Sequence, residues 1–192
     1  MLNGTAIRRP PQYERILARS EGVQFSMNSD VLTGSLLRAL AGTKPYGALL
    51  ELGTGCGLGT CWLLEGMSGH SGLISIDTDP RVQAIAREEL GSDNRLSLIL
   101  GDGGEFLEKC ERRFDLIYAD AWPGKYTLLA QALSLLRPGG LYVIDDMLPQ
   151  PNWPPDHSTR VAALLATLDD TESIDTVKLS WSTGVVIGVK RG

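Results

Sequence analysis

The stretch Leu49–Leu63, "LLELGTGCGLGTCWL", places four glycines within the seven positions 53–59. An apolar run, 47–52, precedes the glycines, and a segment with helical spacing, 60–67, follows them. A glycine-rich turn between a strand and a helix lets the backbone approach a nucleotide-like ligand, because a Cβ would collide there and glycine adopts positive φ at little cost. The stretch therefore predicts a strand, a ligand-binding turn and a helix.

The glycine spacing excludes two common nucleotide sites. The dinucleotide pattern G-x-G-x-x-G fails, since the sixth position is Leu58 counted from Gly53 and Thr60 counted from Gly55. No G-K-[ST] follows that could hold a triphosphate. The remaining pattern is E-x-G-x-G-x-G, beginning at Glu51. A carboxylate there would repel a pyrophosphate but attract the cationic end of another adenosyl compound.

Strand and helix signals alternate through the rest of the chain. Apolar runs of strand length are bounded by Gly, Pro or Asp, and longer segments with helical spacing lie between them. This alternation predicts right-handed crossovers, a parallel sheet covered on both faces, and hence a doubly wound α/β fold. The predicted strands are 47–52, 72–77, 96–100, 114–120 and 140–145, and the predicted helices are 60–67, 80–90, 104–110 and 126–136.

The two ends of the chain extend this pattern. Two β-rich runs within 175–191 are joined by "STG", which predicts a hairpin and an antiparallel last strand. A helix is predicted at 158–170, after a proline-rich connection. Residues 1–45 are expected to form a cap of two helices over the ligand face of a core at 46–192. We expect one domain over 1–192.

Composition narrows the class of protein. The 192 residues carry a formal charge of −5 and 43% hydrophobic residues, and the 18 Lys and Arg are scattered rather than clustered. This charge disfavours a nucleic-acid partner. The three cysteines have no zinc spacing, and we find neither a signal-peptide pattern nor an apolar run of membrane-span length. We expect a cytoplasmic protein without a membrane partner.

Acidic residues at two further strand ends fit an adenosyl ligand. Asp77, followed by Thr78, ends the second strand, where a carboxylate can accept hydrogen bonds from both ribose hydroxyls. Asp102 and Gly103 follow the third strand, where a carboxylate could accept from an adenine amine. The alternative for Asp102 is capping of the next helix, and the two roles are compatible.

Together these motifs resemble the class I S-adenosylmethionine-dependent methyltransferases, and more narrowly the small-molecule O-methyltransferases typified by the catechol and caffeoyl-CoA enzymes. The resemblance runs from about Asp30 to the final hairpin and implies a Rossmann-like, seven-stranded, mostly parallel sheet with a reversed terminal strand. It implies S-adenosylmethionine as cofactor and leaves a homodimer open. The cofactor residues that it implies are Glu51, Gly53, Thr54, Gly55, Gly57, Asp77, Thr78, Asp102, Gly103 and Asp120.

Three aspartates follow the fourth and fifth strands. Asp120 ends one strand, and Asp145 and Asp146 end the next, so their carboxylates are expected to converge. Such a cluster suits Mg²⁺, Mn²⁺ or Ca²⁺. In the family's metal-dependent members, an Asp and an Asp-Asn pair at these places hold an ion that binds both catechol oxygens, and here Asp146 replaces the Asn. Capping of the following segment is the alternative.

The resemblance also implies a catalytic lysine close to Asp120. The family pattern Asp-x-x-Lys has Pro123 at the lysine position, and the nearest lysine is Lys125. We predict that Asp120 and Lys125 serve catalysis, with Lys125 as base; the alternative is a solvated surface lysine.

Selectivity for a small-molecule hydroxyl acceptor is expected from loop residues after these strands: Trp122, Met147, Trp153 and His157. Two other functions remain open. A nucleic-acid methyltransferase would share the cofactor loops, but strand four continues as "DAWP" rather than Pro-Pro-aromatic. A non-catalytic module that binds S-adenosylmethionine would tolerate the missing Asp-x-x-Lys.

Overall fold

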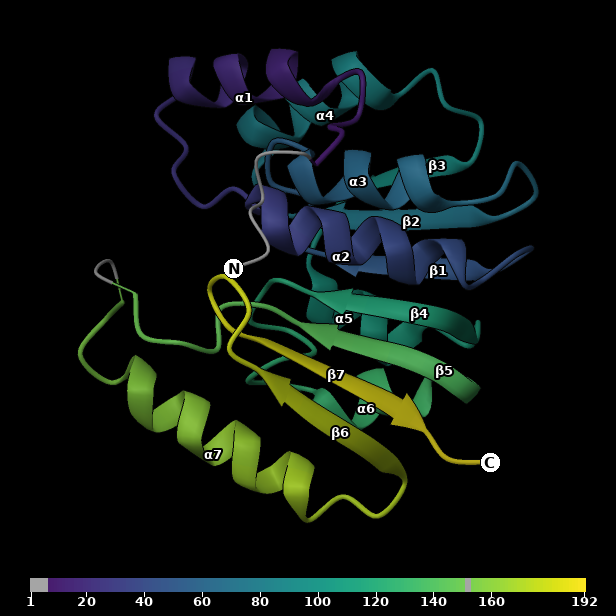
Figure 1. Ribbon diagram of the computed structural model, residues 1–192, viewed down its shortest axis with the longest axis vertical. Helices are drawn as coiled ribbons and strands as arrows, with labels where there is room; N and C mark the ends of the chain where they lie inside the picture. Colours follow the sequence, from purple (N-terminus) through teal and green to yellow (C-terminus); the bar gives the residue numbers. More distant parts are fainter. Residues whose placement is uncertain (1–6, 151–152) are drawn as a thin grey trace.

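The computed structural model describes residues 7–150 and 153–192, and in these residues seven helices and a seven-stranded sheet alternate along the chain (Figure 1). The strand order is β3-β2-β1-β4-β5-β7-β6. The strands are β1 (Ala48–Leu52), β2 (Gly72–Asp77), β3 (Leu96–Leu100), β4 (Phe114–Ala119), β5 (Leu136–Ile144), β6 (Ile174–Leu179) and β7 (Val185–Lys190). The helices are α1 (Tyr13–Gly22), α2 (Val31–Gly42), α3 (Leu58–Gly66), α4 (Pro80–Leu90), α5 (Gly103–Lys109), α6 (Leu129–Ser134) and α7 (His157–Asp169).

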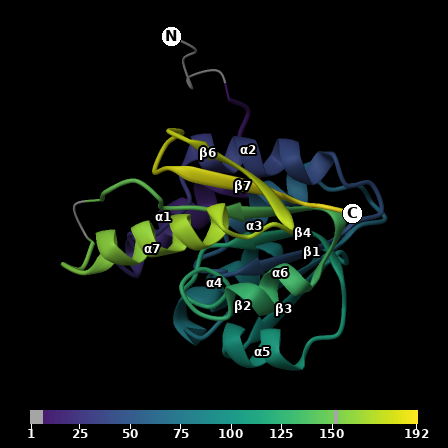
Figure 2. The ribbon, with the colours of Figure 1, turned by 90° about the horizontal axis from the view of Figure 1, so that it is seen from below.

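The sheet separates two apolar cores. Strand side chains alternate between faces, so in β1 Leu49 joins the core under α1–α4, while Leu50 and Leu52 join the core under α5–α7. All five residues of β1 are buried, as expected for a central parallel strand. Figures 1 and 2 show α2 on one side of the sheet and α5 on the other. Helices α1, α3 and α4 share the core of α2, and α6 and α7 share the core of α5.

The strand order confirms the predicted doubly wound α/β fold. From β1 the chain winds outward through β2 and β3, then returns to β4 on the other side of β1. The carboxyl ends of β1 and β4 therefore border the crevice where ligands bind in open α/β sheets. The predicted hairpin is also confirmed: β7 lies antiparallel between β5 and β6 and pairs Val186 with Ile144.

Most predicted elements lie within two residues of the observed ones, but the predicted helix at 126–136 is wrong at both ends. Leu128 has a φ of 58°, so the helix begins only at Leu129. At the other end, Leu136 already pairs with Phe114 in the sheet, which makes β5 longer than predicted. Tertiary pairing here overrides the local helical spacing.

The N-terminal helices pack on the face that carries α3 and α4. Arg15 of α1 pairs with Glu89 of α4 at 2.7 Å, and Gly34 of α2 lies directly against the indole of Trp62 in α3. Between α1 and α2, the segment 23–30 reaches the glycine turn. A Cβ at Gly55 would come within 3.1 Å of the Phe25 ring. The N-terminal part of the chain thus covers one side of the ligand edge.

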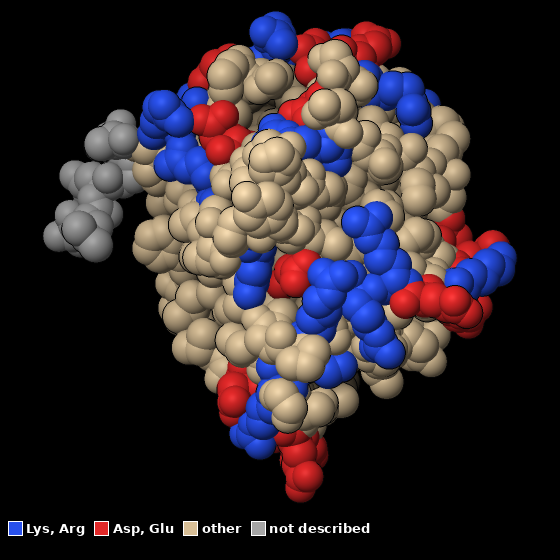
Figure 3. All heavy atoms as spheres, turned by 90° about the vertical axis from the view of Figure 1, so that its right-hand side faces the viewer, with Lys and Arg blue, Asp and Glu red and all other residues tan. Residues whose placement is uncertain are grey.

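The opposite edge of the sheet, where the parallel strands begin, is basic. Figure 3 shows Lys and Arg side chains gathered on this face around a carboxylate. Arg137 of β5 pairs with Asp115 of β4 at 2.5 Å, and Lys44 donates to the carbonyl oxygen of Gly139. Across the described residues, no helix has the length and apolar character needed to cross a membrane.

Candidate active site

The glycine turn after β1 has the backbone conformation that its sequence predicts. Gly53 has a φ of 100° and Gly55 a φ of 52°. A Cβ at Gly53 would lie 2.5 Å from the carbonyl oxygen of Asp120, so the turn packs directly against the end of β4. The amide of Gly55 donates to a carboxylate oxygen of Asp77 at 2.7 Å. The ends of β1, β2 and β4 are therefore joined through this turn.

Gly57 serves helix packing in this structure. It lies immediately before α3 with a φ of 97°, and a Cβ there would lie 2.8 Å from the Cβ of Ala86 in α4. Its amide donates to the carbonyl oxygen of Thr54. Close packing against a neighbouring element is also the role of the third glycine in nucleotide-binding turns of α/β folds.

Glu51 is fully buried beneath the glycine turn. Its Oε2 accepts hydrogen bonds from the hydroxyls of Thr60 and Ser75, each at 2.5 Å. Its Oε1 has no partner among the described residues. The two hydrogen bonds lower the pKa of Glu51, but burial raises it by more, so that the pKa is about 7. A buried carboxylate oxygen without a hydrogen bond is costly unless a partner satisfies it.

The end of β2 carries Asp77 and Thr78, as predicted. Asp77 accepts hydrogen bonds from the amide of Gly55 and, at 2.9 Å, from the amide of Asp79. Each of its carboxylate oxygens has a further lone pair that can accept another hydrogen bond. Thr78 is exposed. Thr54 is buried in the turn and shares a 2.6 Å hydrogen bond with Ser75. Asp77 and Thr78 thus remain accessible beside the turn, whereas Thr54 supports it.

Asp102 caps α5 in the way that the alternative interpretation expected. Its Oδ1 accepts the amide of Glu105 at 2.9 Å, and its side chain is exposed. Gly103 is the first residue of α5, and a Cβ there would contact Leu52 at 3.5 Å. Among the described residues, the second oxygen of Asp102 has no hydrogen-bond partner and can accept from a ligand.

A buried tyrosine joins Asp120 and Asp145. The Tyr118 hydroxyl lies 3.2 Å from Oδ2 of Asp120 and 3.0 Å from Oδ2 of Asp145, and Ser29 lies at 3.2 Å. Burial and the neighbouring Asp145 charge raise the pKa of Asp120 well above its usual range. Burial also raises the pKa of Asp145. The pair therefore favours retaining a proton.

Asp146 lies next to Asp145, but the three aspartates do not form a set of metal ligands in the described residues. It has a φ of 58°, and its amide donates to Oδ1 of Asp145, which also accepts the Thr183 hydroxyl at 2.6 Å. In residues 7–150 and 153–192, no three His, Cys, Asp or Glu side chains are grouped so as to hold a metal ion. The expected convergence is thus seen for Asp120 and Asp145 through Tyr118, but not as a set of three metal ligands.

Lys125 is buried beside these carboxylates, so the surface-lysine interpretation is wrong. Its side chain is 5% exposed, and Nζ lies 5.3 Å from the centroid of the Tyr126 ring. Within the described part of the chain, Nζ makes no hydrogen bond or ion pair. The positive charge of Lys125 lowers the pKa of Asp120, opposing burial and Asp145. Gly124, with a φ of 82°, turns the chain so that Lys125 points inward.

Comparisons with known proteins show the family of this chain. Residues 50–147 match the methyltransferase domain family, which is just over half of the chain. The chain belongs to this family. A protein from Mycobacterium sp. (strain KMS) named "Putative O-methyltransferase" is 35% identical over 140 residues, covering 68% of this chain and 64% of that protein. A protein of the same name from Mycolicibacterium vanbaalenii is 35% identical over 117 residues, covering 58% and 52%.

Solved structures share the fold over nearly the whole chain. Cofactor-bound Rv0187 from MTB has a TM-score of 0.86 at 21% identity, covering 99% of this chain and 94% of that one. The O-methyltransferase TomG from Streptomyces achromogenes, in complex with SAM, has a TM-score of 0.83 at 18% identity, covering 98% and 93%. By contrast, this chain spans about half to two thirds of the length of the curated relatives that it matches.

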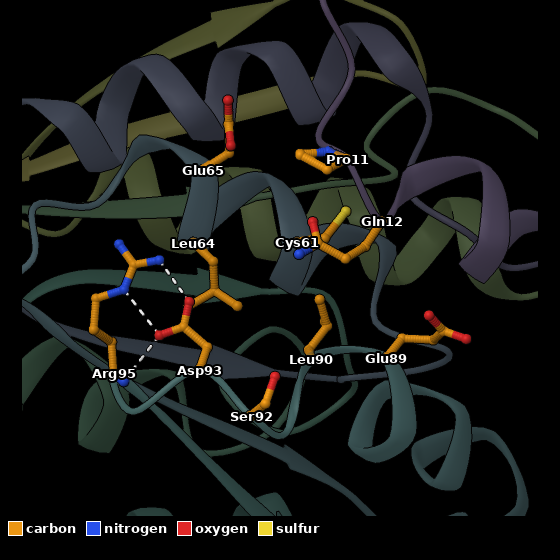
Figure 4. A pocket seen from close by; sticks show the side chains of 10 residues that line it. All are labelled: Pro11, Gln12, Cys61, Leu64, Glu65, Glu89, Leu90, Ser92, Asp93 and Arg95. Carbon is orange, nitrogen blue, oxygen red and sulfur yellow. Dashed lines mark hydrogen bonds and ion pairs between the residues drawn. The ribbon is translucent and has the colours of Figure 1, made fainter.

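A hollow of about 240 Å³ lies elsewhere on this methyltransferase-family chain. Its lining comes from the start of α1, from α3, and from the end of α4 and the loop that follows it, with Cys61, Glu65 and Leu90 among the residues drawn in Figure 4. Asp93 and Arg95 in its wall pair with one another at 2.6 Å. None of the predicted site residues lines it, and we assign the site to the carboxyl edge of the sheet instead.

Sequence reasoning missed several polar residues of the site. Tyr118 could have been found, because it lies two residues before Asp120 and therefore points to the same face of β4. Thr60 and Ser75 belong to no motif that marks them as site residues, although the hydroxyls of both donate hydrogen bonds to Glu51. Ser29 and Thr183 left no signal, since they come from distant segments that only the folded chain brings to Tyr118 and Asp145.

Proposed function

We propose that this chain is an S-adenosylmethionine-dependent O-methyltransferase that acts on the hydroxyl group of a small aromatic molecule. Family membership supports a methyltransferase, and the names of the relatives support transfer to oxygen. The observation that carries the proposal is the Lys125 side chain, which is 5% exposed, lies beside Asp120 and has no hydrogen-bond partner for Nζ among the described residues. Such a group, next to a cofactor turn, has the chemistry needed to receive a hydroxyl proton.

The cofactor side of the proposed site consists of the residues around the glycine turn. Asp77 would accept from the ribose hydroxyls, Asp102 from the adenine amine, and Glu51 would attract the cationic amino acid end. The orphan oxygen of Glu51 and the exposed Asp77–Thr78 tip fit such a ligand. The cofactor supplies a methyl group on a positively charged sulfur.

The acceptor side lies over the ends of β4 and β5. We assign Lys125 as the base: in its uncharged amine form, Nζ takes the acceptor's hydroxyl proton, and Asp120 lies beside it. The acceptor oxygen forms the new bond to the methyl carbon, and the sulfur keeps the electron pair of the broken bond. Much of the rate would come from alignment of the oxygen with the methyl group.

A divalent cation fits these residues only in part. Carboxylate oxygens suit Mg²⁺ or Mn²⁺. However, Asp145 already accepts hydrogen bonds from Thr183, Tyr118 and the Asp146 amide. We therefore derive no step through a cation. Metal assistance and a catechol-like acceptor, as the sequence resemblance implies, are proposals that the experiment below tests directly.

The test combines cofactor binding with turnover. S-adenosylmethionine is titrated calorimetrically into chelator-stripped protein, and a panel of catechols and monophenols is then assayed by mass spectrometry with and without Mg²⁺. We expect binding and an O-methylated product. Product from catechols only when Mg²⁺ is added would support the metal-assisted route, whereas tight binding with no product from any acceptor would favour a non-catalytic module.

The base assignment is tested by Lys125→Gln. We expect turnover to fall by about 10²- to 10⁴-fold, the usual contribution of a positioned base, while cofactor affinity stays unchanged. Lys44→Gln is the matched control, because Lys44 is at the opposite edge of the sheet and donates to the carbonyl of Gly139. Equal turnover in the two variants would refute the role of Lys125.

A further inference from the structure

Four aromatic side chains meet beside Lys125 where α7 begins. We call Trp122, Tyr126, Trp153 and His157 the aromatic cluster. The His157 ring lies 4.3 Å from that of Trp153 and 5.2 Å from that of Tyr126, measured between centroids. Trp122 packs edge-on against Tyr126 at 5.4 Å, and the Arg160 guanidinium lies over Trp122 at 4.9 Å. The cluster joins the loop after β4 to the first turn of α7.

One hydrogen bond crosses this otherwise apolar cluster. The Tyr126 hydroxyl and Nε2 of His157 are 2.9 Å apart. His157 is 9% exposed, and its Nδ1 is buried with no partner in the described residues. An unpaired buried nitrogen costs stability, so a phenylalanine would pack here at lower cost if stacking were the only task. The hydrogen bond to Tyr126 is what a histidine adds at this position.

Tyr126 transmits this constraint to Lys125. The two residues are adjacent, and Nζ of Lys125 lies 5.3 Å from the Tyr126 ring centroid, within range of a cation–π interaction. The hydroxyl end of the same ring is fixed by His157. With no hydrogen bond from the described residues to Nζ, the Tyr126 ring is the contact that defines where the lysine's charge lies.

We infer that Tyr126 and His157 are a pair of positioning residues, which hold Lys125 buried and directed at the acceptor oxygen. The inference rests on the proposed function, since it assigns Lys125 to the reacting hydroxyl. In this pair His157 acts through its hydrogen bond to Tyr126. The pair thereby makes the first turn of α7 part of the catalytic apparatus.

Three variants separate the hydrogen bond from simple packing. Tyr126→Phe keeps the ring over Lys125 but loses the hydroxyl. His157→Phe keeps the stacking on Trp153 but loses the nitrogen, whereas His157→Gln offers an amide nitrogen to the hydroxyl. The matched controls are Tyr46→Phe and His70→Phe. His70 is the only other histidine in the sequence, and its ring stacks on that of Tyr46 with 5.1 Å between centroids.

Two readouts are measured on each folded variant. The first is kcat and KM for cofactor and acceptor. The second is the rate at which an amine-acetylating reagent labels Lys125 in the free protein, followed by mass spectrometry. We expect Tyr126→Phe and His157→Phe to lower kcat by about tenfold, with KM for the cofactor unchanged, because small misplacements of a catalytic group are costly. Labelling of Lys125 should become several-fold faster, and His157→Gln should restore both values.

The outcomes are distinguishable. If Tyr126→Phe and His157→Phe label Lys125 no faster than the control variants, or if His157→Gln behaves like His157→Phe, the inference is overturned. If the wild-type protein methylates no acceptor, the proposed function fails, but the labelling rates still decide whether the pair holds the lysine. Thermal unfolding of each variant identifies any that lose the fold. If His157→Phe does not fold, the wild-type protein is compared with His157→Gln instead.

Discussion

At the scale of single residues, burial decides what the charged groups near the glycine turn can do. The side chains of Glu51, Lys125 and Asp145 are all at least 95% buried. Of the two carboxylates, Asp145 has hydrogen bonds on both oxygens. Glu51 keeps one buried oxygen without a hydrogen-bond partner in the described residues. Such an unsatisfied oxygen is expected of a residue that awaits a ligand.

Glu51 makes stability depend on pH. Its pKa of about 7 in the folded protein exceeds the value of 4.5 expected when unfolded, so the folded state binds the proton more tightly. The stability it contributes is therefore complete below about pH 4.5 and is lost as the pH rises through 7. The loss would amount to roughly 3 kcal/mol. Glu51→Gln should remove this part of the pH dependence.

The measurement is chemical denaturation at pH 5 and pH 8. We expect the free energy of unfolding of the wild-type protein to fall more between these pH values than that of Glu51→Gln. Glu105→Gln is the control, since Glu105 is exposed and pairs only with Lys109. Parallel pH profiles for wild type and Glu51→Gln would contradict the buried, proton-retaining carboxylate.

At the scale of elements, the glycine turn combines two tasks. Gly53 and Gly55 turn the chain toward the ends of β4 and β2, where ligands are expected, whereas Gly57 lets α3 approach α4. The same motif therefore predicts a binding loop and a helix contact. Pattern alone does not separate these roles, because both require positive φ and no Cβ.

Gly57→Ala should destabilise the protein by about 1–3 kcal/mol, from the unfavourable φ and the close contact with Ala86. Gly69→Ala is the control: a Cβ at Gly69 would meet nothing within 4 Å. Denaturant titration of both variants measures the difference. Equal stability would mean that α3 and α4 can separate without cost.

The tips of β2 and β5 are expected to divide cofactor and acceptor roles. We predict that Asp77→Asn weakens cofactor binding, whereas Asp145→Asn spares binding and abolishes methyl transfer. Asp79→Asn is the control for the first, because Asp79 caps α4 by accepting the amide of Arg81. Calorimetry and product analysis test both, and an equal loss of cofactor affinity at 77 and 145 would contradict this division.

At the scale of the whole molecule, the start of α2 and the turn between β6 and β7 meet at the candidate site. The hairpin turn between β6 and β7 bonds the start of α2, with Ser182 on Asp30 and the Trp181 indole donating to the Leu32 carbonyl at 3.0 Å. Thr183 of the same turn binds Asp145, while Ser29 lies against Tyr118. Segments about 150 residues apart thus close over the ends of β4 and β5.

Cofactor binding should therefore slow amide hydrogen exchange in the N-terminal segment 23–30. We expect S-adenosylhomocysteine to slow amide hydrogen exchange there and in the glycine turn, because Phe25 packs on Gly55 and ligand binding stabilises the closed arrangement. The loop 110–113, at the opposite edge of the sheet, is the internal control. Exchange slowed in the glycine turn alone would show that the segment does not close over the cofactor.

Local patterning determined the order of elements, the antiparallel hairpin and the strand tips that bear Asp77, Asp102, Asp120 and Asp145. These follow from periodicity, turn residues and the rule that parallel strands end at one edge. Tertiary structure alone decided that Lys125 is buried and that Tyr118 joins Asp120 to Asp145. Burial and side-chain partners depend on contacts between distant segments, and local sequence does not encode those contacts.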